Sequence, residues 1–581
     1  MKQVVQDLKK GNTYLEDVPA PTVQPGHVLI RARRSLISLG TEKMLVDFGR
    51  AGFLSKARQQ PEKVKQVLDK MKTEGIRPTV EAVFNKLDQP LPLGYCHVGE
   101  VIGIGAGVPD IKLGDRVVSN GPHAEIVNIP HHLVAKIPDQ VDDDTAAFTV
   151  IASIGLQGIR LINPTFGETI VVFGLGLIGL LTAQLLKANG NKVIGIDLDP
   201  QKLDLAKQWG VETIHGGEGD VVKRVQELTN GIGTDGVVIT ASTSSNELVH
   251  QAAQMSRKRG RIVLVGVVGL QLNRADFYEK ELSFQVSCSY GPGRYDDDYE
   301  LKGQDYPIGF VRWTEKRNFE AILDAMQSGA LKTSDLVTTN TTLENVEEVY
   351  AGLGKQKDIA TIIRYSPDEE ASGHTVSYDG EKLHNGQKAI ALVGAGNFTR
   401  MTLLPVLKKL GAPVSVIVSA KGLNGTTLAK KYGISQASTH YAEVLKESSI
   451  GSVIITTRHH LHADMVVEGL QAGKNVFVEK PLAIHMEELE KIIKAWKDSK
   501  RHVMVGFNRR FSPYSMQAKK LLGKNPGPIN VVATMNAGFI PGNSWVQDMQ
   551  QGGGRIIGEA CHMIQLITYF SGSKVIEVMM S

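Results

Sequence analysis

The stretch TIVVFGLGLIGLL, residues 169–181, decides the fold of the first part of this 581-residue chain. An apolar strand, TIVVF, runs into three glycines, Gly174, Gly176 and Gly179, and an apolar helix follows. The first glycine permits a tight turn, the second lets a pyrophosphate approach the backbone, and the third lets the helix pack on the strand. The amino end of that helix favours the charge of a phosphate. The pattern predicts a dinucleotide site on a parallel α/β sheet.

The acidic residue at the end of the next strand indicates which dinucleotide binds. Strand KVIGID ends at Asp197, 18 residues past Gly179. A carboxylate at this place can accept hydrogen bonds from a ribose diol, and it repels a 2′-phosphate. The candidate cofactor contacts are therefore Gly174, Gly176, Gly179 and Asp197, and the expected cofactor is NAD.

A second glycine turn occurs in ALVGAGNFTR, residues 391–400, again between an apolar strand and a helix. Gly394 and Gly396 keep the turn and the pyrophosphate approach, but Thr399 replaces the third glycine and should crowd the packing of the helix. The next strand ends at Ser419 without an acidic residue, and a lysine two positions later can neutralise a 2′-phosphate, so NAD and NADP both stay open. The candidate cofactor contacts here are Gly394, Gly396, Asn397, Phe398, Ser419 and Glu479.

Composition excludes several classes of protein. The chain is 42% hydrophobic and 22% charged with 60 glycines, which is typical of a globular α/β protein of several domains. A formal net charge of +4 is too small to indicate a basic surface that binds nucleic acid, so we expect no nucleic-acid partner. Because no apolar run suits a signal peptide or a membrane span, we expect a cytoplasmic protein without a membrane partner. Cys96, Cys288 and Cys561 lie far apart and indicate no disulfide framework.

The order of apolar segments indicates the domain organisation. Short strands broken by glycine and proline precede a series in which strands alternate with helices, and a second such series follows a polar segment. A Lys- and Arg-rich stretch at 46–91 has helical periodicity and should form surface helices. We expect domains at 1–150 (barrel, first part), 151–290 (Rossmann fold), 291–366 (return to the barrel, with a substrate loop), 367–387 (linker), 388–506 (second Rossmann fold) and 507–581 (C-terminal domain).

Residues 1 to 365 resemble the medium-chain dehydrogenase/reductase family, the zinc-type alcohol dehydrogenase fold. The matching features are GDRV at 114–117, the AE pair of HAEIV, the glycine turn, and KEL at 280–282. The resemblance implies a GroES-like β-barrel domain built from both flanks of a Rossmann fold, with hydride transfer in the cleft between them. The expected fold class is α/β: this pair of domains, then a second Rossmann fold with an incomplete C-terminal α+β domain.

The zinc ligands of that family are missing at the matching positions. Leu39, or Ser38 in a shifted alignment, stands for a cysteine, and Tyr95 and Cys96 stand for His-Glu. FTVIASIGLQG at 148–158 offers only apolar and small residues. A catalytic zinc needs three protein ligands, and Cys96 alone cannot supply them. We therefore expect no metal site and a zinc-independent first module.

Without zinc, side chains must supply the proton at the first site, and Tyr95, His123 and Glu42 are candidates. The segment 289–318 follows the last Rossmann strand and is rich in Tyr, Arg and Gly. It can bind an anionic or sugar-like substrate, although an interface or an ordered surface loop explains it equally well. The candidate substrate residues are Tyr95, His123, Tyr290, Arg294, Arg312 and Trp313.

Residues 388 to 581 resemble the Gfo/Idh/MocA family of oxidoreductases. TTRHHLHADMVVEGLQAGKNVFVEKPL, at 456–482, carries the family's His-x-x-His segment and its Glu-Lys-Pro, and VGFNRRF at 505–511 matches another signature. The resemblance implies that Lys480 lies beside the nicotinamide and the substrate hydroxyl, and that His562 is a catalytic general acid/base. A histidine titrates near neutrality, as that role requires.

The surroundings of His562 depart from the pattern of this family. The family places an aspartate four residues before the histidine, whereas this chain has Gly558 there and Glu559 one position later. Both spacings share a face on an α-helix, so we expect Glu559 to orient or tune His562 as a third catalytic residue.

The C-terminal domain is short, since the chain stops about 75 residues after Phe507. We expect one strand at 529–538, INVVATMNAG, and the start of another in KVIEVMMS at 574–581. Either the chain is truncated or a partner chain completes the sheet, because an open strand edge invites pairing. We expect a homo-oligomer.

The leading hypothesis is an NAD(P)-dependent oxidoreductase with two hydride-transfer modules. Its substrate would be the hydroxyl or carbonyl group of a sugar or nucleotide sugar in polysaccharide metabolism, a class that follows from the resemblance alone. Two alternatives stay open. One module can be a non-catalytic cofactor-binding scaffold, or the whole chain can be an NAD(P)-sensing regulatory protein.

Overall fold

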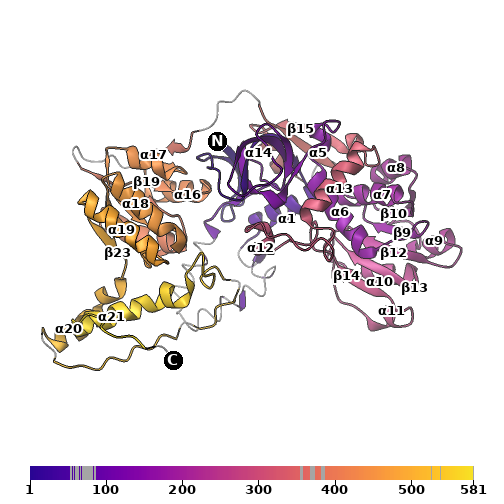
Figure 1. Cartoon of the computed structure of the whole chain (residues 1–581). Coiled ribbons are helices and arrows are strands. Elements are labelled where there is room, and N and C mark those ends of the chain that lie inside the picture. The colour runs from indigo at the N-terminus through magenta and orange to yellow at the C-terminus, as the bar shows by residue number, and fades with distance from the viewer. Residues whose placement is uncertain are drawn as a thin grey trace. The chain divides into compact units, whose positions relative to one another are not determined.

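The computed structural model describes residues 1–579 except 53–54, 57, 59–63, 66, 68–82, 84–86, 354–357, 367–372, 381–386, 525–526, 537 and 543. Most of the helical insert expected at 46–91 therefore lies outside the described residues. The chain forms two compact units, Met1–Asp17 with Pro21–Ser372, and Val18–Ala20 with Gly373–Ser581 (Figure 1). Each unit has its own parallel sheet and its own apolar core.

The first unit contains a largely antiparallel sheet. Strands from both ends of this unit's sequence contribute to it. Its order is β15-β16-β3-β5-β6-β8, and β7 also pairs with β3. The strands of this domain are β1 (Lys2–Gln6), β2 (Thr13–Asp17), β3 (His27–Ile37), β4 (Leu91–Pro92), β5 (His97–Ile104), β6 (Arg116–Ser119), β7 (Ile126–Pro130), β8 (Val134–Lys136), β15 (Val337–Thr342) and β16 (Ala360–Arg364). The helices beside them are α1 (Leu39–Arg50), η1 (His131–Leu133), α5 (Asp143–Ala146), η2 (Ser334–Leu336) and α14 (Val346–Gly352). Because β15 and β16 follow the Rossmann fold in sequence, both flanks build one domain, as the sequence predicts.

A six-stranded parallel sheet in the order β11-β10-β9-β12-β13-β14 forms the first Rossmann fold. The strand order reverses between β9 and β12, and ligands of such sheets bind at the carboxyl ends of the strands there. The strands are β9 (Thr169–Phe173), β10 (Lys192–Asp197), β11 (Glu212–His215), β12 (Thr234–Ile239), β13 (Ser256–Leu264) and β14 (Ser283–Val286). The helices are α6 (Thr149–Ile162), α7 (Leu177–Ala188), α8 (Pro200–Gln208), α9 (Val221–Leu228), α10 (Glu247–Met255), α11 (Arg274–Tyr278), α12 (Asp297–Glu300) and α13 (Glu315–Gln327).

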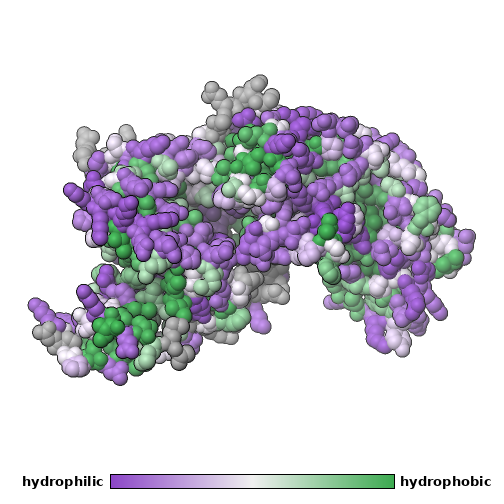
Figure 2. Space-filling view, viewed as in Figure 1, coloured by the Kyte–Doolittle hydropathy of each residue, from purple (hydrophilic) through white to green (hydrophobic). Residues whose placement is uncertain are grey.

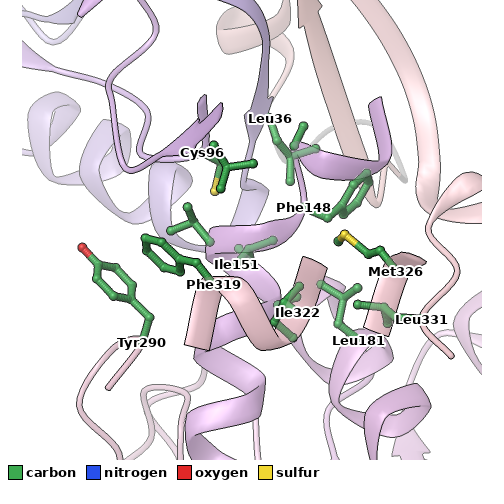
Figure 3. Close-up of a cluster of buried hydrophobic side chains, with 14 of the residues drawn as sticks. Leu36, Cys96, Phe148, Ile151, Leu181, Tyr290, Phe319, Ile322, Met326 and Leu331 are labelled. Atoms are coloured by element: carbon green, nitrogen blue, oxygen red, sulfur yellow. The ribbon is translucent and has the colours of Figure 1, made fainter. Parts of the chain in front are cut away.

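The largest apolar core of the first unit joins the barrel to the Rossmann fold. Leu36 and Cys96 from the barrel lie with Phe148 and with Phe319 of α13 in one buried cluster (Figure 3). Each large apolar side chain buried here stabilises the fold by about 1.5 to 3 kcal/mol. Tyr290 lies at the edge of the cluster, with its ring centroid 5.3 Å from that of Phe319. The core thus fixes the segment that carries Tyr290 against α13.

The second unit repeats the architecture with a sheet in the order β17-β20-β19-β18-β21-β22-β23. β17 (Thr375–Ser377) lies within the expected linker and pairs antiparallel with β20 (Gln436–Ser438). The other strands are β18 (Ala389–Val393), β19 (Val414–Val418), β21 (Ile450–Ile455), β22 (Asn475–Val478) and β23 (Val503–Val505). The helices up to β23 are η3 (Thr399–Leu403), α15 (Leu404–Lys409), α16 (Leu423–Tyr432), α17 (Tyr441–Lys446), η4 (His459–Leu461), α18 (His462–Gln471) and α19 (Met486–Ser499).

After β23 the described residues form helices and no further strand. The helices are η5 (Asn508–Phe511), α20 (Pro513–Leu522), η6 (Ile556–Ala560) and α21 (Cys561–Ser571), and a long irregular segment separates α20 from η6 (Figure 1). The prediction of strands at 529–538 and 574–581 is wrong for their described residues, which belong to no sheet. A strand needs a hydrogen-bonded neighbour, and no described strand pairs with either segment. Figure 2 shows apolar residues gathered over α20 and α21.

Helix length and apolar content bear on the predicted absence of a membrane partner. Within the described parts of the chain, no helix combines the length and the hydropathy that a bilayer span requires. The predicted location of the protein and its oligomeric state stay predictions.

Candidate active sites

The three glycines of the first turn meet three different steric demands. Gly174 has a φ of +99°, and a Cβ atom there would lie 2.7 Å from the amide nitrogen of Ala241. A Cβ atom at Gly179 would lie 1.9 Å from the carbonyl oxygen of Gly174, so only glycine lets α7 start this close to β9. No described atom lies within 4 Å of the Cβ position of Gly176, which caps the amino end of α7. A pyrophosphate fits in such an open space at a helix amino end.

Asp197 ends β10 beside this turn, and backbone N–H groups hold both of its carboxylate oxygens. Oδ2 accepts a hydrogen bond from the amide of Leu175 at 2.6 Å, and Oδ1 accepts one from the amide of Asp199 at 2.9 Å. Since an ionised carboxylate has about four acceptor positions, about two stay available for a ribose diol. The geometry fits the NAD contact that the sequence predicts.

His123 and Glu42 lie in a closed polar network inside the barrel. Both side chains are 0% exposed, and Nε2 of His123 lies 3.2 Å from Oε2 of Glu42. Nδ1 of the same imidazole lies 2.7 Å from Oγ of Ser35, so both ring nitrogens have partners. The structure therefore brings the two candidate residues together but does not expose them to a substrate.

Tyr95 is only partly buried and lies next to this network. Its hydroxyl donates a hydrogen bond of 3.2 Å to Oγ1 of Thr41. Burial raises the pKa of the phenol, and the neighbouring Cys96 raises it further. The phenol therefore keeps its proton at neutral pH and can act as a donor.

Tyr290 and Arg294 form a second cluster in the first unit. The Tyr290 hydroxyl accepts a hydrogen bond of 3.2 Å from Nδ2 of Asn120. The guanidinium of Arg294 lies 5.6 Å from the centroid of the Tyr290 ring, and it forms an ion pair of 2.6 Å with Glu300. Arg312 does not join this cluster, because its guanidinium stacks on the neighbouring indole ring.

The same cluster contains a carboxyl group that the sequence does not reveal. Glu315 is the first residue of α13, and its side chain is fully buried. Burial and, to a smaller extent, the nearby Glu300 raise the pKa of this carboxyl to about 9. A glutamate in the first turn of a helix usually interacts with the helix dipole at the surface. No local pattern therefore distinguishes Glu315 from an ordinary surface residue.

The second glycine turn has the same geometry at its first two positions. Gly394 has a φ of +109°, and a Cβ atom there would lie 2.5 Å from Oγ1 of Thr456. No described atom lies within 4 Å of the Cβ position of Gly396. Thr399, at the third position, is buried, and its hydroxyl lies 2.7 Å from that of Thr456. Thr399 also begins the π-helix η3.

The other predicted contacts of the second cofactor lie around the same edge of the sheet. Asn397 and Phe398 are exposed beside the turn. Ser419 follows β19, and its Oγ accepts a hydrogen bond of 3.2 Å from the amide of Gly425 in α16. Glu479 follows β22, and burial raises the pKa of its carboxyl. These residues therefore follow the carboxyl ends of parallel strands, where a dinucleotide binds.

Lys480 and His562 come together at this edge. Nζ of Lys480 donates a hydrogen bond of 2.6 Å to the carbonyl oxygen of Gly558. His562, at the start of α21, is 8% exposed, and its Nδ1 has no hydrogen-bond partner among the described residues. Burial and, to a smaller extent, the charges of Lys480 and Arg509 lower the pKa of this imidazole to about 4. A neutral imidazole beside an ammonium group can take a proton from a hydroxyl.

Glu559 is not hydrogen-bonded to His562. Its Oε2 accepts hydrogen bonds from Nε and Nη2 of Arg555, at 3.0 and 2.7 Å. Residues Ile556–Ala560 form the π-helix η6 directly before α21. The turn of a π-helix is wider than the α-helical turn assumed from the sequence, so different residues share a face. The orienting role predicted for Glu559 therefore has no hydrogen bond to His562 behind it, whereas the charge of Glu559 does raise the pKa of His562 and so fits the predicted tuning.

The two histidines of the His-x-x-His segment form hydrogen bonds to backbone carbonyl oxygens. Nδ1 of His459 donates a hydrogen bond of 2.8 Å to the carbonyl oxygen of Gly552, and burial lowers the pKa of His459 to about 4. His462 is fully buried, and its Nδ1 lies 2.7 Å from the carbonyl oxygen of Pro481. The sequence shows both histidines but not these contacts, because their partners lie far away in the chain.

Two family models match the chain. Residues 388–507 match the oxidoreductase family Gfo/Idh/MocA with its NAD-binding Rossmann fold, and residues 178–301 match the zinc-binding dehydrogenase family. The chain is an oxidoreductase in which one segment is similar to each of these two families. The predicted pair of families and the α/β fold class are confirmed, and this oxidoreductase is an NAD(P)-dependent enzyme.

The relatives of this oxidoreductase are dehydrogenases. D-guloside 3-dehydrogenase of Escherichia coli (strain K12) is 29% identical over 269 residues, which cover 44% of this chain and 72% of that protein. (R,R)-Butanediol dehydrogenase of Bacillus subtilis (strain 168) is 25% identical over 306 residues, which cover 47% and 80%. Among solved structures, alcohol dehydrogenase TADH from Thermus sp. ATN1 aligns with a TM-score of 0.49 at 20% identity, over 63% of this chain and 100% of that one.

The expectation that the oxidoreductase uses no zinc is wrong, because residues 178–301 match the zinc-binding dehydrogenase family. That expectation compared ligand types at a few aligned positions, such as Leu39 and Tyr95, and such a comparison cannot detect ligands at other places. Within the described residues, no group of three or more His, Cys, Asp or Glu side chains can hold a metal ion. We therefore name no zinc ligand and assign no catalytic step to zinc.

Proposed function

We propose that this oxidoreductase moves hydride between a nicotinamide cofactor and a hydroxyl or carbonyl group of a sugar, nucleotide sugar or polyol, with one site in each unit. The pair Lys480 and His562, at the sheet edge that carries the second glycine turn, is the observation that carries the proposal. The names of two relatives, a guloside dehydrogenase and a butanediol dehydrogenase, support the substrate class. A role in polysaccharide metabolism belongs to the same proposal and rests on resemblance.

The residues of the second unit have complementary roles in this proposal. His562 is neutral at pH 7 because its pKa is lowered to about 4, so it can take a proton from a substrate hydroxyl. The positive charge of Lys480 stabilises the oxygen as it becomes negative, and its hydrogen bond to Gly558 fixes the position of Nζ. Gly394 and Gly396 would hold the pyrophosphate of a cofactor whose nicotinamide accepts the hydride.

The first unit is assigned the same reaction with different residues. Gly174, Gly176 and Gly179 would hold the pyrophosphate, and Asp197 would bind the ribose. The cluster of Tyr290 and Arg294 would contact the substrate, and in the direction of carbonyl reduction Tyr95 would donate the proton that accompanies the hydride. His123 supports this site from inside the barrel, because both of its ring nitrogens are already engaged. Arg312 lies in a separate cluster and is not assigned to this substrate.

Two variants separate the two sites. The full-length protein is assayed by nicotinamide absorbance with NAD and NADP over a panel of nucleotide sugars, aldoses and polyols. Gly176→Asp places a carboxylate where the first pyrophosphate would lie, and Lys480→Ala removes the ammonium group of the second site. Each variant should abolish one activity and leave the other. Gly352→Asp is the matched control, since Gly352 also has open space around its Cβ position and lies outside the segment 289–318.

The outcomes distinguish the parts of the proposal. Unchanged turnover in both variants rules out two hydride-transfer sites. Loss of every activity in one variant and of none in the other means that only one unit is catalytic. Cofactor binding without turnover of any compound in the panel rules out the proposed substrate class.

A further inference from the structure

Two guanidinium groups stack on one indole ring in the first unit. Cζ of Arg160, in α6, lies 3.5 Å from the centroid of a Trp313 ring, and Cζ of Arg312 lies 3.9 Å from it. Cation–π attraction holds each guanidinium on the ring. It also holds two positive charges close together, which is unfavourable unless a negative charge compensates them.

No ion pair compensates these two charges. Among the described residues, neither Arg160 nor Arg312 forms an ion pair with an aspartate or a glutamate. Burial and, to a smaller extent, the charge of Arg312 lower the pKa of Arg160 to about 10. The carboxyl group of Glu320 in α13 interacts with Arg312 over a longer distance, and it also interacts with Lys316 and Arg317. The two guanidinium groups therefore have no ion-pair partner of their own among the described residues.

Hydrogen bonds position the side chain of Arg160 and the backbone of Arg312. Nε of Arg160 donates a hydrogen bond of 2.8 Å to Oδ1 of Asn318, a fully buried residue. The carbonyl oxygen of Arg312 accepts a hydrogen bond of 2.8 Å from Nε of Arg317, and Arg317 pairs with Asp305. Because Arg160 uses only Nε in this contact, its two terminal nitrogens stay available. The guanidinium of Arg160 is thus positioned before any ligand binds, which lowers the entropy cost of binding.

We propose that Arg160 and Arg312 bind the phosphate group of a small molecule at the rim of the Trp313 ring. Arginine is suited to this task because its planar fork of N–H donors matches phosphate oxygens and keeps its charge. One phosphate carries enough negative charge to neutralise both guanidinium groups. The indole ring adds an apolar surface for the rest of the ligand. This site goes beyond the two hydride-transfer sites, because none of its residues belongs to either cofactor turn.

Phosphate binding is measured directly on the full-length protein. Inorganic phosphate is titrated at constant ionic strength against a chloride reference, with tryptophan fluorescence and isothermal calorimetry as readouts. Wild-type protein should bind phosphate, and Arg160→Gln and Arg312→Gln should each weaken binding by about tenfold or more. Trp313→Phe should remove the fluorescence change while calorimetry still detects binding. A hexose phosphate as second titrant should bind tighter than inorganic phosphate if the ligand is a phosphorylated metabolite, and equally if free phosphate is the ligand.

Arg274→Gln is the matched control for these variants. Its guanidinium also stacks on an aromatic ring, at 3.9 Å from the Tyr278 centroid, but that ring has no second arginine on it. This variant should bind phosphate as the wild type does. Arg312 is exposed, so Arg312→Gln should fold even if the loss of Arg160 destabilises the unit. Equal phosphate affinity in wild type and Arg312→Gln, or no binding to the wild type, overturns the proposal.

Discussion

Nζ of Lys480 donates a hydrogen bond of 2.6 Å to the carbonyl oxygen of Gly558, 78 residues further along the chain. The bond joins the end of β22 to the π-helix η6, which leads into His562. His459 makes a second link of the same kind, from the end of β21 to the carbonyl oxygen of Gly552. The side chains of Lys480 and His459, which follow two strands of the sheet, thereby hold the segment that leads to His562. Any movement of this segment changes the geometry of both proposed catalytic groups.

Lys480→Met should lower the turnover that belongs to the second unit by about 10² to 10⁴-fold, because it removes the charge beside the reacting oxygen. Lys519→Met is the matched control, since Nζ of Lys519 also donates to a backbone carbonyl, that of Phe570, at 2.9 Å. The control should keep its turnover. The measurement is kcat and KM for the substrate found in the panel. Equal kcat in wild type and Lys480→Met would show that Lys480 takes no part in the reaction.

Acid should destabilise the second unit through its buried histidines. The pKa values of His459 and His562 are lowered to about 4, whereas an unfolded histidine titrates near 6.5. The stabilisation they provide is therefore fully present above about pH 6.5 and is lost as the pH falls towards 4, by at most about 3 kcal/mol for each histidine.

His459→Asn tests this prediction, because asparagine can donate to the Gly552 carbonyl but does not titrate. Urea unfolding at pH 7 and at pH 4.5 should show a smaller loss of stability for this variant than for the wild type. His502→Asn changes an exposed histidine of the same unit and should behave as the wild type does. A parallel pH dependence in wild type and His459→Asn would contradict the lowered pKa.

Glu315→Gln should stabilise the first unit at high pH. The pKa of Glu315 is raised to about 9, well above the value of about 4.5 expected on unfolding. The stability linked to its proton is fully present below about pH 4.5 and is lost as the pH rises towards 9, on the order of 2 to 4 kcal/mol at pH 8. Denaturant unfolding at pH 5 and pH 8 should show the gain for the variant only at pH 8. Glu247→Gln, at the exposed first position of α10, should show no gain.

Asp197→Ser should weaken the preference of the first site for NAD. The change removes the carboxylate that would bind the ribose and repel a 2′-phosphate, so NADH should bind about tenfold more weakly and NADPH no worse than before. Fluorescence titration of both cofactors in a Gly396→Asp background, which blocks the second site, measures the first site alone. Unaltered selectivity in the double variant would exclude Asp197 as the residue that selects the cofactor.

Features that depend on neighbouring residues were predictable from the sequence. The spacing of Gly174, Gly176 and Gly179 and the strand before them specify a turn within about ten residues, and the structure has that turn. The same holds for Gly394 and Gly396. The end of β10 likewise places Asp197 beside the first turn, because a parallel strand and its neighbour end at the same sheet edge.

Features that depend on distant contacts were not predictable. Glu315 looks like a surface residue until α13 packs against the segment around Tyr290. Arg160 and Trp313 are about 150 positions apart, so no local pattern connects them. Glu559 was expected to orient or tune His562, and its hydrogen bonds to Arg555 could not be predicted because the segment forms the π-helix η6 and not an α-helix. Whether such a segment forms an α-helix or a π-helix depends on packing against other parts of the protein, which the sequence alone does not show.

The π-helix at Thr399–Leu403 takes one more residue per turn than an α-helix would. Relative to an uninterrupted α-helix, every position from Leu404 onward is shifted in helical phase by one residue. The face that α15 buries therefore depends on this π-helix as well as on the periodicity of the residues in α15.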